Sequence, residues 1–189
     1  PQIGHVPSIT YSGYFGGVQV TVFSGAGISA ESGVPTFRDA ETGLWAEVDP
    51  YEISSSHGWR AHPERVWAWY LWRHHMMSAV APNDAHRAVA AWEDYADVHV
   101  VTQNVDNLHT EAGSKSLVEI HGNRTWLRCV GCGIRQPRGA YHFDSLPPIC
   151  IQCGGVIKMD TVMFGEPIPE DVLLASREQA ETCDCMLLV

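Results

Sequence analysis

Short β-branched apolar runs alternate along the chain with longer amphipathic stretches. The first run, Val18–Phe23, has the length of a strand and stops at the glycine turn Gly25-Ala26-Gly27. Pro63 to about Ala79 predicts a helix that is apolar nearly all round and therefore well covered, and Asn83 to about Tyr95 predicts a second helix. Further strands are expected at 99–102, 117–120, 161–164 and 186–189. Strands that alternate with helices predict an α/β fold with a mostly parallel sheet.

Two Cys-x-x-Cys pairs interrupt this pattern. Cys129 and Cys132 are followed after 17 residues by Cys150 and Cys153, in a segment rich in glycine and proline. Each pair can place two thiolates on one side of a tight knuckle, and together they complete a tetrahedral four-sulfur site. We expect one structural Zn²⁺ there; two local disulfides or free thiols are the alternatives. Cys183 and Cys185 are expected to be inert buried thiols at the start of the last strand rather than ligands.

The cysteine segment has too few apolar residues for a core of its own, so it needs the metal as a staple. We therefore predict a Rossmann-like parallel sheet with an inserted small domain made of a helical segment and a four-cysteine zinc module. The predicted boundaries are 1–40, 80–122 and 158–189 for the Rossmann-like domain, 41–79 for the helical module and 123–157 for the zinc module.

The composition limits the classes of molecule that the protein is expected to bind. The formal net charge is −10, and the only lysines are Lys115 and Lys158. An acidic body disfavours direct binding to nucleic acid and favours basic partners, although such a charge can equally be a plain solubility feature. No apolar run reaches the roughly 18 residues of a membrane helix, so no membrane partner is expected. Paired cysteines without a visible secretory signal indicate a reducing compartment, and we predict the cytoplasm.

Five ordered motifs carry a family resemblance. GAGISAESGVPTFR at 25–38 is followed by TQNVDNLH at 102–109, EIHG at 119–122, the four cysteines, and VMFGE at 162–166. A glycine turn that lets backbone amides approach a pyrophosphate is weak evidence alone. In this order, however, the motifs resemble those of the sirtuin family, over about residues 18–189. The resemblance implies an NAD-dependent protein-lysine deacylase, whose Rossmann-like domain binds NAD.

Sirtuins cleave the nicotinamide–ribose bond and transfer the acyl group of lysine to the ribose, giving nicotinamide and 2′-O-acyl-ADP-ribose. His121 matches the base that deprotonates a ribose hydroxyl, a role that suits a side chain with a pKa near neutrality. The resemblance also implies a set of NAD-binding residues, each of which could alone be ordinary turn chemistry: Gly25, Ala26, Gly27, Ile28, Thr36, Phe37, Arg38, Gln103, Asn104 and Asp106.

Acyl selectivity is predicted from a helical pair. Tyr70 and Arg73 are three residues apart and share a helix face. In one sirtuin subgroup a Tyr-x-x-Arg here recognises the carboxylate of succinyl-, malonyl- or glutaryl-lysine, with a small residue, here Ser54, opening the pocket. The alternative is that Tyr70 is a core residue and Arg73 a surface residue.

The partner is then an acylated lysine in a protein or peptide. By the same resemblance, its backbone would pair with a strand edge formed by Val162, Phe164 and Gly165. Met163 stands where many members of the family have an aromatic residue.

The end of the chain departs from the family pattern. Val189 falls where the family's next strand would lead into a Gly-Thr-Ser turn, so we expect a C-terminally truncated member, in which NAD binding is an open question. A catalytically impaired module that only binds acyl-lysine and NAD is therefore the main alternative. A nicotinamide-dependent oxidoreductase with a zinc ribbon, which would form NADH, and a transferase of ADP-ribose to protein are the other two.

Overall fold

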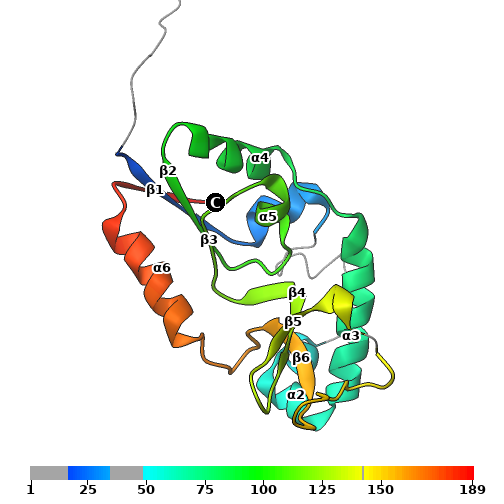
Figure 1. Ribbon diagram of the computed structural model, residues 1–189. Coiled ribbons are helices and arrows are strands. Elements are labelled where there is room, and N and C mark those ends of the chain that lie inside the picture. The colour runs from blue at the N-terminus through cyan, green and yellow to red at the C-terminus, as the bar shows by residue number, and fades with distance from the viewer. Residues whose placement is uncertain (1–16, 35–48, 142) are drawn as a thin grey trace, which may run out of the picture.

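The computed structural model describes residues 17–34, 49–141 and 143–189. A four-stranded parallel sheet, in the order β3-β2-β1-β7, forms the larger part (Figure 1). Its strands are β1 (Gln19–Ser24), β2 (Asp97–Thr102), β3 (Leu117–Glu119) and β7 (Cys185–Leu188). The strands predicted at these four places are therefore confirmed, with ends that differ by one or two residues from those expected.

Helices cover both faces of this sheet. Val22 of β1 packs with Val98 and Val100 of β2 and with Val89 of α4 (Asp84–Ala91). The preceding side chain of the strand, Thr21, points to the opposite face of the sheet. Its hydroxyl donates to the carbonyl of Gln179 in α6 (Glu170–Thr182) at 2.7 Å. In Figure 1, α6 accordingly runs along one side of the sheet, with α4 and α5 (Leu108–Ala112) on the other.

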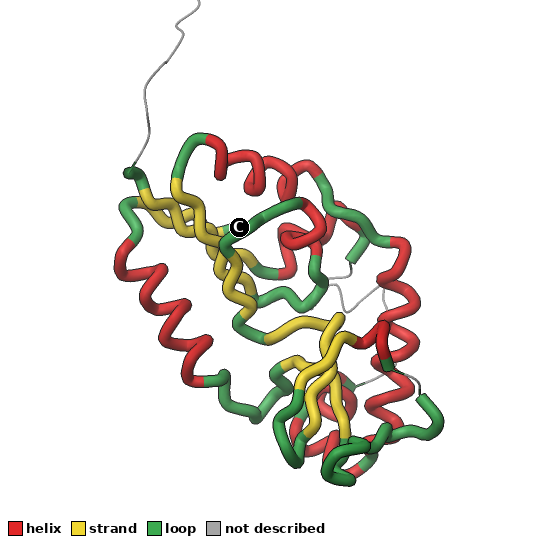
Figure 2. The backbone as a smooth tube through the Cα atoms, in the orientation of Figure 1, coloured by secondary structure: helices red, strands yellow, loops and turns green. Residues whose placement is uncertain are grey.

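A three-stranded antiparallel sheet with the order β5-β4-β6 lies beside the first. It contains β4 (Gly122–Cys129), β5 (Arg135–Pro137) and β6 (Ile157–Thr161). Figure 2 shows the two sheets as separate groups of strands, with helices packed around the second. Those helices are α1 (Pro50–Ser54), α2 (Ser56–Ala61) and α3 (Pro63–Met76). The predicted α/β fold with a small cysteine-bearing module is thus confirmed.

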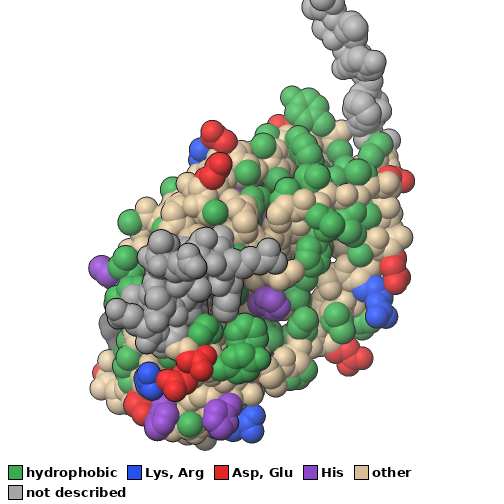
Figure 3. Space-filling model, turned by 180° about the vertical axis from the view of Figure 1, so that it is seen from behind, with side chains coloured by type: hydrophobic (Ala, Val, Ile, Leu, Met, Phe, Trp, Pro, Cys, Tyr) green, Lys and Arg blue, Asp and Glu red, His purple; other side chains and the backbone are tan. Residues whose placement is uncertain are grey.

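Short 3₁₀ segments complete the described chain: η1 (Ala26–Ser32), η3 (Met77–Ala79), η4 (Trp92–Asp94) and η5 (Arg138–Ala140). None of the helices among the described residues has the length and apolar character needed to cross a membrane. On the face drawn in Figure 3, Lys and Arg side chains are scattered, most of them beside Asp or Glu, and the described part of that face shows no continuous basic patch.

The small module is anchored by α3. The fully buried Trp67 packs against Leu127 and Met159, and its indole N–H donates to the carbonyl oxygen of Ile157 at 2.8 Å. The expectation that this helix is well covered holds for only one of its faces, because Trp72 is 41% exposed and Met76 is 55% exposed. One face of the helix packs on the small sheet and the opposite face meets solvent.

Two further expectations are corrected by the structure. The run at 161–164 is no strand; β6 ends at Thr161, and Phe164 instead makes an isolated bridge with Ser55. Cys185 is exposed because it begins β7, an edge strand that pairs only with β1 among the described strands, and Cys183, which follows α6, is only half-buried. These two thiols therefore lie at the surface instead of in the core.

Candidate active site

Three loops meet at one edge of the parallel sheet. The neighbouring strands β1, β2 and β3 run parallel, so their carboxyl ends share one edge, which is where open α/β sheets bind ligands. Gly25 follows β1, the loop 103–107 follows β2, and His121 lies two residues after β3. The fold therefore gathers the predicted NAD residues of the described chain at that edge: Gly25, Ala26, Gly27, Ile28, Gln103, Asn104 and Asp106.

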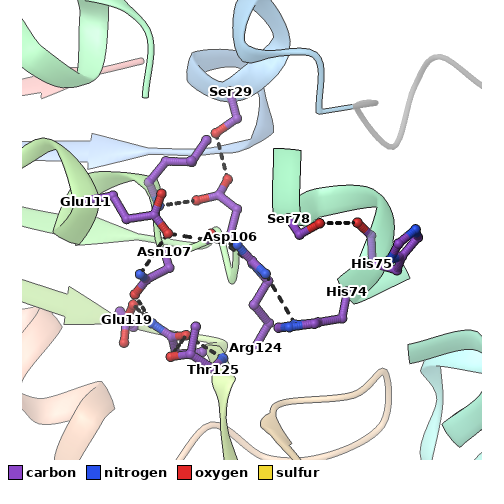
Figure 4. A network of polar contacts seen from close by, with 12 residues as sticks. Ser29, His74, His75, Ser78, Asp106, Asn107, Glu111, Glu119, Arg124 and Thr125 are labelled. Atoms are coloured by element: carbon purple, nitrogen blue, oxygen red, sulfur yellow. Dashed lines mark hydrogen bonds and ion pairs between the residues drawn. The ribbon is translucent and has the colours of Figure 1, made fainter. Parts of the chain in front are cut away.

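A buried serine links these loops. The Ser29 hydroxyl donates to Asp106 Oδ2 at 2.7 Å and accepts a hydrogen bond from Asn104 Nδ2 at 3.2 Å. The same Asn104 amide donates to the carbonyl oxygen of Gly25 at 2.8 Å. Figure 4 shows Ser29 reaching down from η1 to Asp106. The glycine turn and the loop after β2 are thus held together by side-chain hydrogen bonds.

The geometry of His121 fixes its tautomer. Its Nδ1 lies 3.0 Å from the carbonyl oxygen of Gln103. Because a carbonyl oxygen can only accept, Nδ1 must carry the hydrogen, and a neutral ring then has its lone pair on Nε2. The backbone carbonyl of His121 also accepts from the N–H of Val162 at 2.9 Å. His121 therefore presents a basic nitrogen and is tied to the segment after β6.

Two histidines lie beneath this edge. The rings of His86 and His109 meet edge to face with their centroids 4.9 Å apart. His109 is 2% exposed, and its Nε2 lies 2.9 Å from the Ser24 hydroxyl. Burial, with a smaller effect from His86, lowers the pKa of His109 to about 4 although Asp106 opposes the shift. His109 is thus a neutral supporting residue under the candidate site.

The predicted substrate segment is braced by the chain itself. The N–H of Phe164 donates to the carbonyl of Ser54 at 2.8 Å, and its carbonyl accepts from the N–H of Ser56 at 2.9 Å. Its ring, 43% exposed, stacks on Tyr51 with centroids 5.4 Å apart. Phe164 can therefore offer a substrate its ring, since both of its backbone groups are already engaged.

A buried ion pair between Lys158 and Glu166 stabilises the same segment. Lys158, only 2% exposed, donates to both carboxylate oxygens of Glu166, at 2.8 and 2.6 Å, and to the carbonyl of Thr161 at 3.1 Å. Glu166 in turn accepts from the N–H of Met163 at 3.1 Å. Burial lowers the pKa of Lys158, and the nearby carboxylate opposes that shift. Residues 161–166 are therefore held as a preformed loop.

Tyr70 lies on α3 beside this loop, and Arg73 follows three residues later on the same helix. The Tyr70 hydroxyl is 3.3 Å from Thr161 Oγ1, and Tyr70 and Arg73 are both half-buried. Burial raises the pKa of Tyr70 and lowers the pKa of Arg73. Ser54, also half-buried, contacts the loop at Phe164, so Tyr70 and Ser54 flank the two ends of the run 161–164.

The four predicted cysteine ligands come together. Their sulfur atoms all lie within 4.8 Å of one another, with 3.4 Å between Cys129 and Cys153 and 3.8 Å between Cys132 and Cys150. Four thiolates bonded to zinc at about 2.3 Å would be about 3.8 Å apart. All six cysteines of the described chain are free thiols, which contradicts the disulfide alternative. The donor set and spacing fit a structural Zn²⁺.

A model of the Sir2 family matches residues 25–189. The chain belongs to this family. It is 55% identical over 179 residues to the NAD-dependent protein deacylase Sir2 of Mycolicibacterium smegmatis, a match that covers 91% of this chain and 73% of that protein. The NAD-dependent protein deacylase of Mycobacterium tuberculosis is 51% identical over 179 residues, with 91% and 74% covered.

Solved Sir2 structures agree with the fold. The complex of a Sir2 homologue with NAD superimposes with a TM-score of 0.81 at 35% identity and covers 90% of this chain and 66% of that chain. A Sir2 complex with a p53 peptide and NAD⁺ gives 0.76 at 31% identity, with 90% and 69% covered. The sirtuin resemblance is confirmed at the level of the family.

Several site residues of this Sir2-family chain were not singled out from the sequence. Ser29 and His109 lie inside recognised motifs, and their position there was the available signal. Lys158 and Arg124 lie outside the motifs and have no local pattern that marks them. Of the predicted residues, Thr36, Phe37 and Arg38 lie outside the described part of the chain.

Proposed function

We propose that this Sir2-family chain is an NAD-dependent protein-lysine deacylase that prefers acidic acyl groups, namely succinyl, malonyl and glutaryl, and also removes acetyl. The observation that carries the preference is the pair Tyr70 and Arg73, three residues apart on α3, with the Tyr70 hydroxyl 3.3 Å from Thr161 Oγ1 in the loop 161–166. A partly desolvated guanidinium beside a phenol suits a carboxylate, because the guanidinium can donate two parallel hydrogen bonds and the phenol a third.

NAD is the co-substrate in this proposal, bound at the carboxyl edge of the parallel sheet. Asn104 and Asp106 would hold the ribose and the nicotinamide amide, since their side chains are anchored to the glycine turn through Gly25 and Ser29. Thr36, Phe37 and Arg38 would complete the cofactor site. A zinc ion held by the four cysteines would be structural, because a four-thiolate shell leaves no open position for water.

His121 is the proposed general base. Its Nε2 carries the lone pair when Nδ1–H donates to Gln103, as the 3.0 Å contact requires. The base would take the proton of a ribose hydroxyl, so that the hydroxyl oxygen could bond to the acyl carbon; the bond from that carbon to the lysine nitrogen would then break, and the lysine would leave as the free amine. The hydrogen bond from Val162 to His121 places the segment proposed to bind the acyl-lysine next to this base.

An acylated lysine in a protein or peptide is the proposed partner. Gly165 would supply backbone groups to the extended substrate, and Phe164 its ring. Val162 would supply its carbonyl, since its N–H already donates to His121. Gly165 has φ 81°, and a Cβ there would lie 3.0 Å from Ser56 Oγ, so only glycine fits this turn without strain.

The test measures nicotinamide release from NAD with matched acetyl-lysine and succinyl-lysine peptides. We expect succinyl turnover to dominate and Arg73→Met to lower kcat/KM for the succinyl peptide roughly 10- to 150-fold, which corresponds to about 1.5–3 kcal/mol for a charged hydrogen bond. Acetyl turnover should change far less. Arg65→Met is the matched control, because Arg65 lies on the same helix with its exposed side chain paired to Glu52 at 3.0 Å.

Two other results would contradict the proposed function. A clear preference for acetyl-lysine in the unsubstituted chain would refute the carboxylate clamp and leave a plain deacetylase. Peptide binding without nicotinamide release would favour the binding-module alternative.

A further inference from the structure

We infer that Arg124 is a positioning residue that holds the NAD-binding loop 103–107 in register with α3, the helix that carries Tyr70 and Arg73. The inference rests on the proposed function, because it assigns to one largely buried side chain the link between NAD binding and acyl recognition. Figure 4 shows Arg124 lying between Asp106 on one side and His74 on the other.

The contacts of Arg124 come from three separate elements. Its side chain is 13% exposed. Nε donates to the backbone carbonyl of Asp106 at 3.0 Å, Nη1 lies 3.3 Å from His74 Nδ1 on α3, and Nη2 lies 3.9 Å from Glu111 Oε1 on α5. The backbone N–H of Arg124 also donates to the carbonyl of Val105 at 3.1 Å. Two successive carbonyls of the loop are therefore held by one residue at the start of β4.

The contact with His74 requires a neutral ring. A guanidinium can only donate, so Nδ1 of His74 must be an unprotonated acceptor. Burial first, and then the nearby guanidinium groups of Arg138 and Arg124, lower the pKa of His74 to about 4. The ring is therefore neutral at physiological pH, and the link to α3 is intact there.

The loop needs such a brace. Asn107 has φ 70°, a left-handed conformation that is uncommon outside glycine, and Asp106 must stay 2.7 Å from Ser29 to keep the two NAD loops joined. Asn123, the neighbour of Arg124, also donates to Asn107 Oδ1 at 2.8 Å. A lysine at 124 would keep the charge but has one nitrogen, which cannot reach acceptors on three sides as a planar guanidinium does.

The experiment compares Arg124→Lys, His74→Leu and the matched control His75→Leu. His75 is exposed on the same helix, and its side chain points away from Arg124 in Figure 4. NAD affinity is measured by isothermal titration calorimetry, which needs no turnover. Nicotinamide release with succinyl and acetyl peptides gives the acyl preference, and thermal unfolding gives stability.

We expect Arg124→Lys to raise the Kd for NAD at least about fivefold. His74→Leu cuts only the link to α3, so it should change the Kd for NAD less than about twofold but lower the succinyl-to-acetyl ratio at least about threefold, while His75→Leu changes neither. An Arg124→Lys variant that loses only thermal stability and keeps its NAD affinity would make Arg124 a plain structural residue and overturn the inference.

Equal effects of His74→Leu and His75→Leu would refute the link to α3 even if Arg124→Lys fails to fold. A preference of the unsubstituted chain for acetyl-lysine would refute the proposed acyl selectivity alone. The calorimetric comparison of Arg124→Lys with the unsubstituted chain would still decide the role of Arg124 in that case.

Discussion

Acidification should destabilise this chain through His109. The Ser24 hydroxyl donates to Thr102 Oγ1 at 2.8 Å, so it must accept from the N–H at Nε2 of His109. Nδ1 is left as the bare nitrogen, and it has no hydrogen-bond partner within the described chain. A second proton would have to enter at this buried, unpartnered atom, which explains why the pKa falls to about 4.

The sign and size follow from proton linkage. An unfolded histidine titrates near pH 6.5, so between about pH 6.5 and pH 4 the unfolded chain binds more protons than the folded chain. The free energy of unfolding therefore falls as the pH is lowered through this window. For one group with these two pKa values, the loss is about 2 kcal/mol from pH 7 to pH 5 and about 3 kcal/mol in full.

Urea unfolding at pH 7, 6 and 5 measures this loss. His109→Gln keeps an amide N–H for Ser24 but binds no proton, so we expect it to be less stable at pH 7 yet to lose about 2 kcal/mol less on acidification than the unsubstituted chain. The difference between the two slopes is the quantity of interest, since His74 also has a pKa of about 4 and adds to both. His57→Gln, at an exposed position of α2, controls for the exchange of residue type.

Equal slopes for the unsubstituted chain and His109→Gln would refute the reasoning. They would mean that His109 takes up its proton as readily in the folded chain as in the unfolded chain. That result would require water or a rearranged Ser24 to reach Nδ1.

Three other predictions test the rest of the fold. A chelator should release about one Zn²⁺ per chain and lower the thermal midpoint, and the absence of any released metal would refute the zinc site. Lys158→Met should cost about 3–5 kcal/mol in urea unfolding because it strands the Glu166 carboxylate, and adding Glu166→Gln should recover part of this loss; no recovery would mean that the ion pair is not the cause. Gly122→Ala should cost more than about 2 kcal/mol, since Gly122 has φ 76° and a Cβ would collide with the carbonyl of Asp160; an unchanged urea midpoint would contradict the left-handed turn at this glycine.

The sheet and the metal site could be predicted because their signals are local. An apolar run such as Val18–Phe23 needs only its own residues to indicate a strand, and β1 lies within one position of it. The spacing of the four cysteines likewise carries the geometry of a knuckle pair, and their sulfur atoms do converge. The NAD loops were found because several short motifs occur in one order, which compensates for the weakness of each.

The misplaced strand at 161–164 shows where such signals fail. Its valine and threonine have strand propensity, but propensity does not determine which strand the segment would pair with. The partner is the junction of α1 and α2 at Ser54–Ser56, more than a hundred residues earlier, and it offers Phe164 only one bridge. The buried Lys158–Glu166 pair then bends the segment into a loop.

The role of Arg124 could not be predicted from the sequence for a related reason, which strand β4 illustrates. The strand begins at Gly122 beside the NAD loop and ends at Cys129 in the metal cluster, so it connects these two sites in eight residues. Its sequence, GNRTWLRC, has no regular alternation of polar and apolar residues, and nothing in it indicates that Arg124 faces Asp106, His74 and Glu111, which come from three elements. A long-range brace is specified only by the folded topology, whereas the metal ligands at the other end of the same strand are specified by their spacing.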